Sequence, residues 1–164
     1  MTLRSLLALL LLLLVPGMAQ AACTDPPDRG VDWQRCALDG LDLSDVAMPQ
    51  VRLREASLFR TNLADSDLSG TDAYRAKFVN ANLARADLRD ANLFQADMTK
   101  ANLTEASLVH ADLRQSKLFA ADLAGADLTG ARLTGADLSL ANLSGATWTN
   151  GSHVCRAGSV GRCN

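Results

Sequence analysis

The sequence predicts an all-β solenoid, and three features of residues 36–150 carry this prediction. Every fifth residue is large and apolar across Leu38–Trp148, and Ala73 is the single small exception. A small residue stands two places earlier, and it is Ala in 14 of the 15 repeats between residues 76 and 146. No insertion or deletion interrupts the count. The chain therefore repeats one short structural unit over most of its length.

A five-residue period fits neither regular secondary structure. On an α-helix, five residues advance by about 500°, so successive large residues would lie about 140° apart around the surface. In a flat strand, an odd period would place them on alternate faces. One buried side chain per repeat therefore requires the chain to turn once per repeat. Each repeat then forms one side of a closed coil, and coils stack about 4.8 Å apart.

The remaining repeat positions agree with this geometry. The residue before the large one is usually Asp or Asn, as at Asp42, Asn82 and Asn142. These residues tolerate turn conformations and bond nearby backbone, so we expect them to support the turns. The two residues after the large one vary widely and include several glycines and Pro49, as expected for outward positions.

The runs Ala81–Arg85, Ala86–Asp90 and Ala126–Gly130 resemble the A-(D/N)-L-x-x unit of the pentapeptide repeat family. The resemblance covers about 115 of the 164 residues. It implies the family fold, a right-handed quadrilateral parallel β-helix with four repeats in each coil. The chain would then contain just under six coils.

Residues 1–21 read as a signal peptide. Arg4 precedes a ten-residue apolar run, 6–15, which is too short to span a bilayer. Pro16 ends the run, and Ala19-Gln20-Ala21 has the small-x-small pattern of a cleavage site. We therefore predict an exported protein of the periplasm without a transmembrane segment. The alternative for the run is a buried helix or an anchor.

A lipid anchor at Cys23 is a second alternative, because a cysteine follows Ala21-Ala22. Gln20 argues against it, since a lipid-attachment box usually has an apolar residue there. The predicted organisation is a signal peptide at 1–21, an N-terminal cap at 22–35, the β-helix at 36–150 and a C-terminal cap at 151–164.

Four cysteines, Cys23, Cys36, Cys155 and Cys163, flank the array of repeats, and none lies within its body. Export and an even count favour disulfides. Bridged Cα atoms lie within about 7 Å, whereas several coils separate the two ends. The predicted pairs are therefore Cys23–Cys36 and Cys155–Cys163, each closing a loop over one end of the stack. The same separation argues against one metal ion bound by all four.

The sequence gives no sign of catalysis. The only histidines are His110, at an outward position, and His153 near the C-terminus. The spacing of the Asp residues follows from the repeat, and no phosphate or nucleotide fingerprint is present. We therefore expect no catalytic residue, no metal and no cofactor, and we predict that the protein is not an enzyme.

Charge divides the predicted solenoid into two halves, because residues 20 apart share a column. Two adjacent sides carry nine basic and six acidic residues, and the other two carry two basic and nine acidic ones. All four outward aromatic residues lie on the basic half. We predict a binding face there, with chance decoration as the alternative. It consists of Arg54, Phe59, Arg60, Tyr74, Arg75, Phe94, Lys100, Arg114 and Phe119.

The predicted function is a non-catalytic exported binding or scaffold module that presents a rigid basic and aromatic face to a protein or an anionic envelope polymer. The family resemblance implies a rival, a DNA mimic that inhibits an enzyme such as gyrase. The signal peptide and the modest charge of the acidic half argue against that role and against nucleic acid as a partner. A third reading is an inert structural component of the envelope. The sequence leaves the oligomeric state open.

Overall fold

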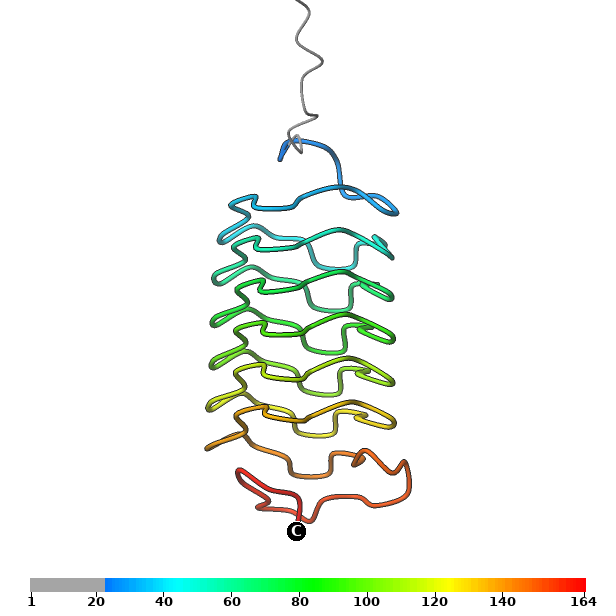
Figure 1. The fold of residues 1–164 in the computed structure, drawn as a ribbon, viewed down its shortest axis with the longest axis vertical. Helices are drawn as coiled ribbons and strands as arrows, with labels where there is room; N and C mark the ends of the chain where they lie inside the picture. The colour runs from blue at the N-terminus through cyan, green and yellow to red at the C-terminus, as the bar shows by residue number, and fades with distance from the viewer. Residues whose placement is uncertain (1–22) are drawn as a thin grey trace, which may run out of the picture.

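The computed structural model describes residues 23–164, so the predicted signal peptide at 1–21 lies outside the described residues. Residues 31–150 form six stacked coils, drawn from blue to orange in Figure 1. The coil geometry thus includes residues 31–35, which the sequence analysis placed in the N-terminal cap. No helix long enough and apolar enough to cross a membrane occurs between residues 23 and 164.

Single-residue parallel bridges hold the coils together. Each bridge joins the second residue of one repeat to the residue 20 positions later, as in Asp32 to Arg52 and Asp72 to Asn92. No longer strand forms in residues 23–164, because each repeat turns after its bridge. Four repeats therefore complete one coil, and the fold is the right-handed quadrilateral parallel β-helix that the sequence predicted.

Each side of the quadrilateral is one column of repeats. We number the sides by their repeats in the first and last coils. Side 1 runs from 31–35 to 131–135, side 2 from 36–40 to 136–140, side 3 from 41–45 to 141–145, and side 4 from 46–50 to 146–150.

The large residues fill the axis of the coils, as predicted. Leu53, Phe78 and Met98 are each 0% exposed, and the small residues two places earlier are buried as well. Where a hydroxyl replaces Ala in that column, it finds a partner in most cases. Thr61, for example, donates to the Leu38 carbonyl at 2.7 Å. The small column therefore packs against the backbone of the coil and tolerates a short polar side chain.

Each turn lies after the large residue. Every fifth residue from Gly30 to Gly145 has a positive φ, including side chains as large as His110 (φ 59°). The first N–H of the next repeat donates to the carbonyl of the large residue, as in Ala56 to Leu53 at 3.0 Å. A positive φ at the third residue of such a turn is the feature of a type II turn.

The Asp and Asn residues that precede the large residues support the turns from a neighbouring position. They lie in the bridges, and each side-chain oxygen accepts the N–H two residues later, as in Asn102 and Thr104 at 3.1 Å. Their predicted bond to nearby backbone is therefore present, and it supports the turn from outside.

Both ends carry the predicted disulfides. Cys23 pairs with Cys36, and Cys155 pairs with Cys163, with Cα separations of 5.5 and 4.8 Å. Trp33, 3% exposed, closes the axis at the N-terminal end. The C-terminal segment, red in Figure 1, lies against the last coil and pairs with it in the antiparallel sense.

Candidate functional site

A column of four side chains on side 1 forms a regular surface cluster. Arg54, Tyr74, Phe94 and Arg114 hold the same repeat position in four successive coils, and we call them the aromatic ladder. The two rings stack with centroids 6.0 Å apart and planes 6° apart. The Arg54 guanidinium lies 4.7 Å from the Tyr74 centroid, and that of Arg114 lies 5.2 Å from the Phe94 centroid.

Each ring of the ladder has one neighbour in the coil before it and one in the coil after it. Tyr74 lies between Arg54 of the preceding coil and Phe94 of the next, and Phe94 lies between Tyr74 and Arg114. Arg75 also lies near Tyr74, with its guanidinium 5.0 Å from the ring centroid, and both rings remain partly exposed. The ladder therefore joins four successive coils in one column of aromatic and cationic side chains at the surface.

The ladder arginines are paired with carboxylates on the same side. Arg54 bonds Asp72 at 3.0 Å, and Arg114 bonds Asp112 at 2.5 Å. Arg132 approaches the same Asp112 carboxylate at 3.5 Å. Hydrogen bonds from the Arg114 side chain lower the pKa of Asp112, and burial opposes this effect. Much of the positive charge on side 1 is therefore compensated locally.

We expect the ion pair between Asp112 and Arg114 to make the free energy of unfolding decrease at acid pH. A carboxyl group with a lowered pKa in the folded state stabilises the protein above the unfolded-state pKa, about 3.9 for Asp, and loses this effect as pH falls further. Below about pH 4, Asp112→Asn should therefore lose less melting temperature per pH unit than the wild type. Thermal melts between pH 6 and pH 2 measure the difference. Arg114→Gln, which removes the other partner, should flatten the profile similarly; unchanged profiles in both variants would contradict the assignment.

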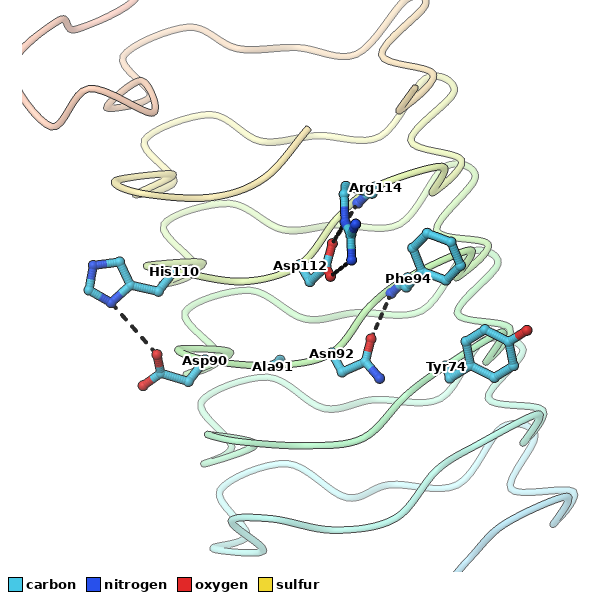
Figure 2. A pocket seen from close by; sticks show the side chains of 8 residues that line it. All are labelled: Tyr74, Asp90, Ala91, Asn92, Phe94, His110, Asp112 and Arg114. Atoms are coloured by element: carbon cyan, nitrogen blue, oxygen red, sulfur yellow. Dashed lines mark hydrogen bonds and ion pairs between the residues drawn. The ribbon is translucent and has the colours of Figure 1, made fainter. Parts of the chain in front are cut away.

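A shallow depression of about 310 Å³ lies beside the ladder. Figure 2 shows Tyr74 and Phe94 at one edge and His110 with Asp90 at the other. The His110 Nδ1 lies 3.6 Å from an Asp90 oxygen, and both side chains are mostly exposed. An exposed imidazole–carboxylate pair without an adjacent nucleophile is not a catalytic set. Within residues 23–164, no three His, Cys, Asp or Glu side chains converge as metal ligands would.

Several cations on side 2 and its corners have no carboxylate partner among the described residues, although Lys117 on the same side lies 3.6 Å from Asp97. Arg60 lies 4.8 Å from the centroid of the Phe59 ring, and Arg75 bonds Gln95 at 2.8 Å. Lys77 and Lys100 make no ion pair in the described structure. Phe59 and Phe119 are each 38% exposed. We call this set the cationic face; it consists of Phe59, Arg60, Arg75, Lys77, Lys100 and Phe119.

The opposite half keeps an excess of acid. Its two arginines are both paired, Arg85 with Asp65 at 2.5 Å and Arg89 with Asp87. Hydrogen bonds from those arginines lower the pKa of Asp65 and of Asp87. The remaining carboxylates of sides 3 and 4 have no Arg or Lys partner in the described structure.

The structure thus divides the predicted binding residues between two sides. Arg54, Tyr74, Arg75, Phe94 and Arg114 meet around the ladder. Phe59, Arg60, Lys100 and Phe119 lie on side 2 at separate heights. The predicted binding face did not include Lys77, or Asp72 and Asp112, although all three were counted in the charge of the basic half. The spacings of 18 and 2 residues between Arg54 and Asp72 and between Arg114 and Asp112 could have indicated those pairs.

These features define the class of the protein. It is a repeat solenoid in which one set of side chains fills the axis and the others point outward. The family model described as pentapeptide repeats matches residues 36–72, 56–95, 81–118 and 116–150, with eight copies. The chain therefore belongs to the pentapeptide repeat family.

Several solved structures of the family are similar to this chain. Rfr23 from the cyanobacterium Cyanothece 51142 is 27% identical, with 70% of this chain and 85% of that chain covered and a TM-score of 0.45. A pentapeptide repeat protein from Nostoc Pcc 7120 is 30% identical over 63% of this chain and 83% of its own, with a TM-score of 0.28. QnrB1, a plasmid-mediated fluoroquinolone resistance protein, is 17% identical over 71% and 70%, with a TM-score of 0.37. No curated protein matches the chain significantly.

Proposed function

We propose that this protein is a non-catalytic binding module that presents its cationic face to an anionic partner, either an acidic protein or an anionic envelope polymer. One observation carries the proposal. Arg60, Lys77 and Lys100 on side 2, with Arg75 at the adjoining corner of side 1, have no carboxylate partner among the described residues, and side 2 also exposes Phe59 and Phe119. Such a mixture of cations and apolar rings is typical of protein interaction surfaces.

The fold supports this role because its surface is rigid. Every coil is bonded to its neighbours through the backbone, so the outward side chains are held in fixed columns. A rigid surface loses little conformational freedom on binding, and more of the contact energy appears as affinity.

A protein that imitates DNA must present a strongly acidic surface, and in this protein only the acidic half could provide it. Its Arg85–Asp65 and Arg89–Asp87 pairs reduce the density of free negative charge on sides 3 and 4. No feature of the described residues favours that role over the cationic face.

Export is part of the proposal. It is supported by the signal-peptide pattern of residues 1–21 and by two disulfides, which persist in oxidising compartments. The Cys23 sulfur is bonded to Cys36, whereas a lipid anchor would need the same sulfur. We therefore propose a protein of the periplasm without a lipid anchor.

The proposal can be tested with two matched charge reversals. Lys100→Glu changes the cationic face, and Glu105→Lys changes the acidic half one repeat later in the same coil; the two backbones match, with φ values of 57° and 58°. We expect Lys100→Glu to slow the capture of an envelope partner by about tenfold at low salt and to reduce its salt dependence, because surface charges mainly govern association. Glu105→Lys should leave capture unchanged. Surface capture of envelope extract at low and high salt, with mass-spectrometric identification, measures both.

Phe119→Ala provides a second variant on the same face. Loss of an apolar anchor should speed dissociation more than it slows association. If all variants retain every captured species with wild-type kinetics, the protein does not bind through this face, and the inert structural reading becomes the better one.

A further inference from the structure

Side 2 presents three straight columns of side chains along the stack. We number the coils from 1, residues 31–50, to 6, residues 131–150. In coils 1–5 the repeats of side 2 bury their third residue, whereas the second, fourth and fifth residues are partly or largely exposed. Bridges join residues 20 apart, so each of these positions runs from coil to coil at a spacing of about 4.8 Å. In coils 2–5 the middle column consists of Phe59, Val79, Thr99 and Phe119.

The cations of side 2 alternate between the two outer columns. Arg60 and Lys100 hold the fifth position in coils 2 and 4, and Lys77 and Lys117 hold the second position in coils 3 and 5. Each of these coils thus contributes one cation, and the next cation lies one coil further along on the other side of the middle column. The residues that face these cations across the middle column are Ser57, Asn80, Asp97 and Ala120, in chain order.

Carboxylates lie beyond both ends of this row of cations. Asp39 is in coil 1 and Asp137 is in coil 6, and neither coil has a cation on side 2. The Asp39 carboxylate is held in place, because it accepts a hydrogen bond from the Ser57 hydroxyl at 2.6 Å. The stretch of side 2 that attracts an anion therefore spans four coils.

Asp97 is the one acidic residue within the row. Its carboxylate accepts the Thr99 N–H at 3.1 Å and lies 3.6 Å from the Lys117 ammonium group. Lys117 is thus partly compensated, whereas Arg60, Lys77 and Lys100 carry the free positive charge of the row. These three cations already define the alternation from one outer column to the other.

A β-1,4-linked chain of uronic acids has the matching geometry. In such a flat chain each sugar ring is turned over relative to the ring before it, so successive carboxylates point to opposite edges. Each ring also advances the chain by about the spacing of one coil. A carboxylate beside each cation makes a charge-assisted hydrogen bond. The apolar faces of the rings leave water when they pack over Phe59, Val79 and Phe119.

An extended acidic peptide matches this row less well. Its side chains also alternate between two edges, but it advances by only about 3.4 Å per residue, against about 4.8 Å per coil. Its acidic groups therefore lose register with the cations within a few coils. The spacing favours the polysaccharide.

We propose that side 2 binds four residues of a linear β-1,4-linked polyuronic acid that lies over the middle column, parallel to the axis of the coils. Each carboxylate meets one cation. The opposite edge of each residue carries hydroxyl groups, which bond Ser57, Asn80 and Asp97 in the facing positions. This inference rests on the proposed function, because it names the chemical class of the anionic partner of the cationic face.

Two tetrasaccharides with equal charge test the geometry. β-1,4-linked tetraglucuronate is the flat ligand, and α-1,4-linked tetragalacturonate carries the same four carboxylates on a buckled chain. Calorimetric titration of the mature protein at low salt should show at least about tenfold tighter binding of the flat ligand. Its affinity should rise from trimer to tetramer and level off at the hexamer, because Asp39 and Asp137 lie beyond the four coils.

A charge-neutral exchange tests the alternation. Asn80→Lys combined with Lys100→Asn moves one cation by one coil within its column and leaves the net charge unchanged. Both positions have φ 57°, so the backbone accommodates both side chains. We expect the exchange to weaken binding of tetraglucuronate at least about fivefold, because coil 3 then has two cations and coil 4 has none. Glu105→Lys, on the acidic half, should not weaken it.

Three results would overturn the inference: no binding of tetraglucuronate at millimolar concentration, equal affinity for the two tetrasaccharides, or wild-type affinity in the exchange variant. Each would show that the spacing of the cations selects no polyuronic acid. The proposed function has a separate test, since it fails when Lys100→Glu leaves the capture of envelope species unchanged. An acidic protein captured through the cationic face, without binding of tetraglucuronate, would keep the proposed function and reject the polysaccharide.

Discussion

Phe78→Ala should destabilise the β-helix by about 3–5 kcal/mol. Phe78 is 0% exposed and is the largest fully buried side chain in the described structure. Its neighbour in the axial column, Ala73, is equally buried and is the one small residue at that repeat position. We expect the Phe78 ring to fill the volume that a larger residue at 73 would occupy, so its removal leaves a cavity. Urea unfolding of the mature protein measures the loss.

Phe59→Ala is the matched control. It removes the same atoms at an outward position that is 38% exposed, and the cost should be well below that of Phe78→Ala. Equal losses would show that the two rings are not distinguished by burial.

The compensation between Phe78 and Ala73 has its own test. Ala73→Leu alone should overpack the core and destabilise the protein by about 1–3 kcal/mol. In the Phe78→Ala background the same change should cost less or restore stability, because the cavity accepts the added atoms. Strict additivity of the two changes would contradict the shared-volume argument.

Removal of the C-terminal disulfide by Cys155→Ser with Cys163→Ser should cost about 2–3 kcal/mol for a loop of this length. The Cys155 carbonyl accepts the Gly145 N–H, and the Cys155 N–H donates to Ala146, both at 2.9 Å. Loosening the loop should therefore release the strand that covers sides 3 and 4. Calorimetry gives the stability loss, and hydrogen exchange should show faster exchange at Gly145 and Trp148.

Cys23→Ser with Cys36→Ser is the control for location. It should destabilise the opposite end and leave exchange at Gly145 unchanged, because several coils separate the two disulfides. Alkylation of the unreduced mature wild type should label no thiol. Labelling at Cys155 or Cys163 would show that the C-terminal bridge is not formed.

The repeat made most of the fold predictable. One large residue in every five is compatible with few structures, so the axial positions of residues such as Leu53 and Met98 followed from spacing alone. The place of the turn was less evident. The left-handed residue carries Gly, Asp, Arg, His or Leu at different repeats, so composition gave only a partial signal. The backbone closure of the coil overrides the preference of those side chains.

The candidate site was predictable only in outline. Columns gave the side on which each charge lies, but net charge per side conceals local pairing. From the sequence alone, Arg54 and Arg114 were assigned to the binding face without a partner. In the structure, Asp72 and Asp112 neutralise much of their charge. Lys77 gained importance because it has no such partner in the described chain. The antiparallel pairing of the C-terminal cap had no sequence signal, because it depends on which residues of the last coil the segment after residue 152 meets.

The 20-residue spacing of the bridges also limits how such a chain can change in length. Insertion or deletion of a whole coil leaves every later residue on its own side, so a column such as Arg54–Tyr74–Phe94–Arg114 stays aligned. Loss of a single repeat keeps the axial residues inward but turns everything after it by one quarter of the coil. Asp87 would then lie in the column of Asn82, and the two charge halves would no longer match above and below the change. The surface columns therefore stay intact only when the chain gains or loses whole coils, whereas the core also tolerates the gain or loss of single repeats.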